Sequence, residues 1–108
     1  MTEAVREELD RIVNALVETG IVSKIILFGS HARGEERPDS DIDLCVLTPI
    51  KDRHPIDLMK EFRRKLCRVK RKPMDLLAYN QDHFYNTAKR SSSFEHEIEK
   101  EGVLIYGT

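Results

Sequence analysis

Several features common in secreted, membrane-bound and nucleic-acid-binding proteins are missing from this sequence. No apolar run approaches the roughly 18 residues that a membrane-spanning helix needs. No basic segment followed by an apolar one opens the chain, so no secretory leader is expected. The formal net charge is −1, which gives no general attraction to nucleic acid or to an anionic membrane.

Cysteine is scarce, and its placement argues against the usual cysteine-based sites. Cys45 stands in an apolar run and Cys67 in an expected helix, without the spacing of metal ligands. The sequence therefore predicts two reduced thiols in a cytoplasmic protein rather than a disulfide. Three of the histidines, His54, His83 and His96, are scattered and do not suggest a zinc site.

Length and hydrophobic periodicity predict a single small domain over residues 1–108, of the α/β (α+β) class. Thr2 can cap the first helix and Gly20 can end it, while Ser92 and Glu95 match a capping box. The pattern predicts a small mixed sheet of about four strands packed with helices, covered on at least one face. The expected elements are a helix over 3–19, a strand over 24–29, a loop over 30–40 with one helical turn, a strand over 41–48, a helix over 56–69, a strand over 74–79, helices over 81–90 and 93–101, and a strand over 103–106.

Two aspartates open the expected strand over 41–48. Side chains two residues apart in a strand point to the same face, so Asp41 and Asp43 project together while Ile42 and Leu44 point into the core. Two carboxylates this close repel each other unless a cation lies between them. A hard divalent ion such as Mg²⁺ suits these oxygen ligands. The alternative is a polar strand entrance at which both side chains reach water.

The turn before this pair provides a second signal. Gly29 and Ser30 stand where a strand ends and a helical turn can begin, so backbone N–H groups there can bind an anion. Glycine lets a phosphate approach the backbone, and the Ser30 hydroxyl can donate another hydrogen bond. The stretch is not a P-loop, because Glu35 and Glu36 stand where that motif has lysine and serine or threonine. An anion-binding turn beside a metal-binding pair suits a nucleoside triphosphate with Mg²⁺.

The stretch GSHARGEERPDSDIDL, residues 29–44, resembles the signature of the polymerase-β-type nucleotidyltransferase superfamily. In this fuller form it is similar to the minimal nucleotidyltransferases, the MNT proteins that occur as partners of HEPN proteins. The resemblance covers most of the chain. It includes a third aspartate, Asp75 in KPMDLLAY, and the ending EKEGVLIYG. It implies a polymerase-β-like nucleotidyltransferase fold.

The resemblance also implies roles for individual residues. Gly29 and Ser30 would hold the triphosphate of ATP, and Asp41 and Asp43 would ligate two Mg²⁺ ions. Asp75 would join the metal that activates the acceptor hydroxyl, or would act as its base. All three aspartates are therefore the expected catalytic residues.

Two further residues are expected beside the nucleotide, Arg33 and Ser40. A guanidinium group suits phosphate geometry, but Arg33 can equally hold the loop in place by bonding to backbone carbonyls or to Glu35. His31 is expected at the surface without a catalytic role, because nothing nearby forms a triad with it.

The implied activity is transfer of a nucleoside monophosphate, AMP in the leading interpretation, to a hydroxyl of a partner protein. In the MNT proteins this corresponds to an antitoxin that adenylylates a HEPN ribonuclease toxin, within a homo- or hetero-oligomer. One alternative is a non-catalytic antitoxin that neutralises its partner by occlusion. Another is transfer to a small molecule, and transfer to RNA is disfavoured by the near-neutral charge.

A basic stretch covers residues 60–72, with eight lysines and arginines and Glu61 as its only acid. One interpretation is a solvated helix surface followed by a charged turn. The other is a docking face for an acidic partner or for RNA. Both interpretations are compatible with the sequence.

Overall fold

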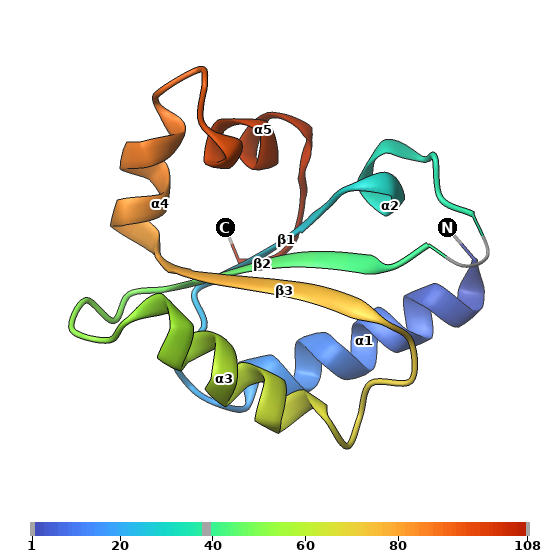
Figure 1. Cartoon of the computed structure of the whole chain (residues 1–108). Helices are drawn as coiled ribbons and strands as arrows, with labels where there is room; N and C mark the ends of the chain where they lie inside the picture. The colour runs from blue at the N-terminus through green and yellow to red at the C-terminus, as the bar shows by residue number, and fades with distance from the viewer. Residues whose placement is uncertain (1, 38–39, 108) are drawn as a thin grey trace.

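Four strands form one mixed sheet, and helices lie on both of its faces (Figure 1). The computed structural model describes residues 2–37 and 40–107 of the chain. Residues 38 and 39 of the expected loop therefore lie outside the described residues. The elements are α1 (Glu3–Val17), β1 (Lys24–Phe28), α2 (Ser30–Arg33), β2 (Ile42–Thr48), α3 (Pro55–Leu66), β3 (Met74–Asn80), α4 (Gln81–Ala88), α5 (Phe94–Glu101) and β4 (Val103–Tyr106).

The strands lie in the order β3-β2-β1-β4. β1 is antiparallel to both β2 and β4, whereas β2 and β3 are parallel. A parallel pair needs a crossover connection, and α3 provides it between β2 and β3. The predicted α/β (α+β) class with a mixed four-stranded sheet is confirmed.

Side chains of β2 alternate between two hydrophobic cores, one on each face of the sheet. Ile42, Leu44 and Val46 pack in the larger core with α1 and α3. Cys45 and Leu47 point to the opposite face and pack in a smaller core with α4 and α5. Figure 1 shows the helices divided in this way, α1 and α3 on one side of the sheet and α4 and α5 on the other. Both faces are covered, so β2 is apolar along most of its length.

The helix ends follow local capping chemistry, with one correction to the sequence analysis. Thr2 Oγ1 accepts a hydrogen bond from the Val5 N–H at 3.3 Å, as predicted. The cap of α5 is Ser93 rather than Ser92, because the Ser93 hydroxyl accepts the N–H of His96 at 3.0 Å. The predicted capping box is therefore wrong, and Glu95 instead accepts a hydrogen bond from the Tyr79 hydroxyl. Among the described residues, no helix is long and apolar enough to span a bilayer.

Candidate functional site

Three segments that are distant in sequence meet at one end of the sheet. β2 and β3 run parallel and start at the same end of the sheet, and their register places Asp43 directly beside Asp75. β1 runs the other way and ends with Phe28 opposite Asp43. The turn at Gly29 therefore follows immediately beside the carboxylates. The sheet topology alone brings these segments together, because each strand is fixed in register by its backbone hydrogen bonds.

Gly29 packs directly against the Asp43 carboxylate. A Cβ atom added at Gly29 would lie 2.1 Å from Asp43 Oδ2, closer than any real side chain allows. Gly29 also has a φ of 76°, in the left-handed region that favours glycine. It caps α2 without a side-chain hydrogen bond, and Ser30 is the first residue of that helical turn. The position therefore requires glycine for space and for conformation.

The carboxylates are close enough to influence one another. Burial raises the pKa of Asp43 above its ordinary value, and the charges of Asp75 and Asp41 together with a hydrogen bond to Asp75 raise it further. His31 partly opposes this shift. Asp43 is half-buried, whereas Asp41 and Asp75 are exposed. β2 begins at Ile42, so Asp41 lies just before the strand and not inside it.

The three aspartates offer the oxygen ligands that a hard divalent cation prefers. A cation among them would relieve the repulsion that raises the pKa of Asp43. In the ranges 2–37 and 40–107, however, no three or more acidic, histidine or cysteine side chains are already gathered as a metal-binding group. The three aspartates suit Mg²⁺ by their chemistry and because they lie at the same end of the sheet. Their carboxylates would have to move closer together to bind the ion.

Arg33 makes the loop-holding contacts that the sequence left as an alternative. Its guanidinium lies 3.2 Å from Glu35 and 3.6 Å from Glu101, so it joins α2 to the end of α5. The hydrogen bond to Glu35 is the main reason that the pKa of Arg33 is raised. A contact between Arg33 and nucleotide stays a prediction.

His31 is buried, so the expectation of a surface position is wrong. Its Nε2 atom lies 3.3 Å from the backbone oxygen of Ser40, two residues before β2 begins. The Ser40 hydroxyl in turn accepts the N–H of Arg37 at 2.7 Å. His31 and Ser40 thus shape the segment that leads into Asp41, and nucleotide binding by Ser40 stays a prediction.

Glu8 is a buried carboxylate that the sequence analysis did not identify. Its Oε2 atom accepts the backbone N–H groups of Arg71 at 2.7 Å and Lys72 at 2.6 Å, and Oε1 lies 3.0 Å from Arg11 Nη2. These contacts hold the connection that leads into β3 and Asp75. Its position in the sequence could have indicated that it is buried, because Glu8 falls three residues after Val5 on the apolar stripe of α1.

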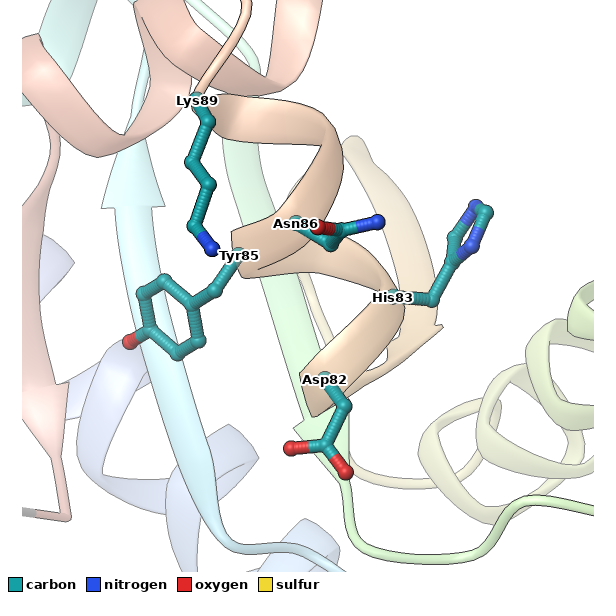
Figure 2. A pocket seen from close by; sticks show the side chains of 5 residues that line it. All are labelled: Asp82, His83, Tyr85, Asn86 and Lys89. Carbon is teal, nitrogen blue, oxygen red and sulfur yellow. The ribbon is translucent and has the colours of Figure 1, made fainter.

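A separate hollow of about 490 Å³ lies on α4, as Figure 2 shows. Its lining side chains stand around the outside of the helix, with His83 directed away from Tyr85 (Figure 2). α4 follows the C-terminal end of β3, whereas Asp75 lies at the N-terminal end of that strand. The hollow is therefore at the other end of the sheet from the aspartates. Its lining residues are Asp82, His83, Tyr85, Asn86 and Lys89.

Comparison with known proteins agrees with this arrangement. The family model described as a nucleotidyltransferase domain matches residues 7–105. A Methanocaldococcus jannaschii protein named as a candidate protein adenylyltransferase is 31% identical over 100 residues, covering 91% of this chain and 94% of that protein.

Crystal structures show the same fold. A candidate nucleotidyltransferase from Sulfolobus solfataricus superposes with a TM-score of 0.60 at 17% identity, over 99% of this chain and 89% of its own. A mutant of the toxin–antitoxin complex MntA–HpeT superposes with a TM-score of 0.60 at 25% identity, over 92% of this chain and 72% of the matched chain. The chain belongs to the nucleotidyltransferase domain family and is an MNT-type nucleotidyltransferase with a polymerase-β-like fold.

Proposed function

We propose that this nucleotidyltransferase transfers AMP from ATP to a hydroxyl group of a partner protein, in a reaction that requires Mg²⁺. The observation that carries the proposal is the placement of Asp43 beside both Asp75 and the Gly29 backbone. An anionic cluster next to a bare backbone turn can accept a triphosphate only together with cations. The relative from Methanocaldococcus jannaschii, which is named for protein adenylylation, supports a protein as the acceptor.

Asp41, Asp43 and Asp75 would hold two Mg²⁺ ions. Such ions neutralise charge on the triphosphate and lower the pKa of an acceptor hydroxyl. The N–H groups of the turn at Gly29 and Ser30 would hydrogen-bond the phosphate oxygens. Asp75, exposed on the edge strand, faces the side from which an acceptor can arrive.

In the transfer, the acceptor oxygen forms a bond to the α-phosphorus of ATP. The bond between that phosphorus and the oxygen bridging to the β-phosphate breaks, and pyrophosphate leaves with the electron pair. The acceptor proton passes to the Asp75 carboxylate or to water. Arg33 Nε and Nη1 face Glu35 and Glu101, and Ser40 Oγ accepts the Arg37 N–H, so contact with the nucleotide would use the remaining N–H donors of Arg33 and the O–H of Ser40.

The acceptor is proposed to be a toxin of the HEPN ribonuclease type, silenced by adenylylation. The structural similarity to an antitoxin-containing complex supports a toxin as the partner. The partner would supply the hydroxyl and complete the site. Neutralisation by occlusion, without transfer, is the competing outcome and is separated from transfer by experiment.

The test is incubation of the chain with its toxin partner, Mg²⁺ and each labelled nucleoside triphosphate in turn, followed by intact mass measurement. We expect the toxin to gain the mass of AMP with ATP, and Asp43→Asn and Asp75→Asn to abolish the gain. Asp82→Asn is the matched control, because Asp82 pairs with Lys51 at the other end of the sheet. Toxin inhibited by the Asp43→Asn variant without nucleotide would favour occlusion and refute transfer as the mechanism.

A further inference from the structure

Residues 60–72 form a basic surface that the transfer reaction does not use. They carry eight lysines and arginines and one acid, a net charge of +7. Because the whole chain has a net charge of −1, the other 95 residues carry −8. The chain is therefore strongly polarised although it is nearly neutral overall, and the positive charge is concentrated on α3 and on the connection to β3.

The geometry of α3 places these cations on one outer surface. Leu58, Phe62 and Leu66 are buried against the sheet and α1. With about 100° between successive residues, Lys60 and Arg64 point away from that buried stripe, and Arg63 lies on its flank. The exposed cations of the surface are Lys60, Arg63, Arg64, Lys65, Arg68, Lys70 and Arg71.

Little of this charge is neutralised within the chain. Lys65 lies 3.5 Å from Glu18, and the only acid of the stretch, Glu61, pairs outside it with Arg53. Across residues 2–37 and 40–107, the ion pairs include none at Arg63 or at its exposed basic neighbours Arg64 and Arg68. The surface is therefore open to carboxylates from another molecule.

The basic surface continues to the edge of the candidate site. The connection over 67–73 ends at β3, in which Asp75 is the second residue. Lys72 lines a hollow of about 360 Å³ together with Arg37 and Ser40, the residue before Asp41. Asp75 points to the sheet face opposite α3, because it alternates with Leu76, which packs in the core with α1 and α3. β3 is an edge strand, so a molecule bound at the connection over 67–73 reaches Asp75 around the start of that strand. Figure 1 shows the connection leading from α3 to the start of β3.

We infer that this basic surface docks an acidic segment of the acceptor protein and so guides the acceptor hydroxyl toward Asp75. The inference rests on the proposed function and names the chemistry of its partner. Charge complementarity favours an acidic polypeptide and accelerates its encounter with the site. RNA is the weaker fit, because Phe62, the one aromatic residue of the stretch, is fully buried and cannot stack on bases.

Binding of synthetic probes tests the inference without requiring catalysis. The probe is a fluorescein-labelled peptide with one tyrosine flanked by aspartates and glutamates, followed by fluorescence anisotropy in the absence of ATP. We expect binding that weakens as salt is raised, and a rise in Kd on the order of tenfold or more in R63E/R64E/R68E. The matched control, K89E/R90E/K100E, changes net charge equally on the opposite face of the sheet and should leave Kd within about twofold.

Each outcome supports or overturns the inference. An equal loss of peptide affinity in both triple variants would show that only net charge matters, and would overturn the docking surface. Tighter binding of a single-stranded RNA with the same number of charges would overturn the acidic polypeptide as partner. Absence of peptide binding to the unmodified chain would also overturn the inference.

A second readout separates this inference from the proposed function. With the toxin partner and ATP, R63E/R64E/R68E should raise the KM for the toxin while kcat stays unchanged. If the unmodified chain transfers no nucleotide, the proposed function fails while the anisotropy result still decides the docking surface.

Discussion

Replacement of Glu8 by glutamine should destabilise the protein strongly although the side chain keeps its size, because the change removes the charge and turns one acceptor oxygen into an NH2 donor. Glu8 is fully buried, and its carboxylate accepts the N–H groups of Arg71 and Lys72. A hydrogen bond to a charged group contributes about 1.5–3 kcal/mol, and a neutral one about 0.5–1.5 kcal/mol. Over two such bonds the expected loss in the free energy of unfolding is about 2–3 kcal/mol at neutral pH.

The dependence on pH gives this prediction a sharper form. Burial by itself would raise the pKa of Glu8, but hydrogen bonds from the Arg71 N–H, the Arg11 guanidinium and the Lys72 N–H together lower it below its ordinary value. Such a group contributes stability above its pKa in the unfolded chain, and this contribution is lost as the pH falls through the pKa in the folded chain. The difference between the unmodified chain and Glu8→Gln should thus be largest at neutral pH and shrink below about pH 4.

Urea unfolding at several pH values measures this difference. Glu7→Gln is the matched control, because Glu7 is exposed on the same helix and should change stability little. At a temperature where Glu8→Gln is folded, its kcat should also fall, since Glu8 holds the connection into β3. A Glu8→Gln variant as stable as the unmodified chain at neutral pH, or a difference that stays constant into acid, would refute the reasoning.

Three other changes test the site. Gly29→Ala should abolish binding of a non-hydrolysable ATP analogue in a fluorescence assay, because its Cβ would collide with the Asp43 carboxylate; normal binding would contradict the close packing. Asp43→Asn should raise Tm in the presence of EDTA, because it removes a half-buried charge that Asp75 and Asp41 repel, and it should not gain the stabilisation that we expect Mg²⁺ to give the unmodified chain. The opposite order of Tm values would show that the carboxylates do not repel. Arg33→Ala should leave Tm almost unchanged, because its partners Glu35 and Glu101 are exposed, and any large fall in Tm would show that the link between α2 and α5 matters for folding.

The elements of the fold could be predicted because their signals are local. Periodic apolar residues mark α1 and α3, and short apolar runs mark the strands, β-branched in β1 and rich in leucine in β3. The signal from Gly29, Asp41 and Asp43 is also local, because Gly29 follows the end of β1 and the two aspartates lie at the start of the next strand, β2. The register that pairs Asp43 with Asp75 is not visible in the spacing, because it depends on the crossover through α3.

The contacts that were missed depend on partners far along the chain or on small shifts of backbone. Glu8 accepts a hydrogen bond from the backbone N–H of Lys72, 64 positions away, and no pattern within one helix predicts such a contact. His31 looks polar and exposed in sequence, yet it is buried, with its ring beside the backbone oxygen of Ser40, nine positions away. Ser92 and Ser93 are equally good caps by composition, and only the path of the chain after α4 selects Ser93.

The parallel pairing of β3 makes the length of residues 67–73 more important than their composition. Sliding β3 by one position would set Met74 or Leu76 beside Asp43 in place of Asp75, and would turn its apolar side chains to the wrong layers. If this segment docks the acceptor as inferred, its charges can change to suit a new acceptor while its number of residues stays fixed. Such a change of charge would leave the catalytic aspartates in place, whereas one inserted residue would move Asp75 away from Asp43.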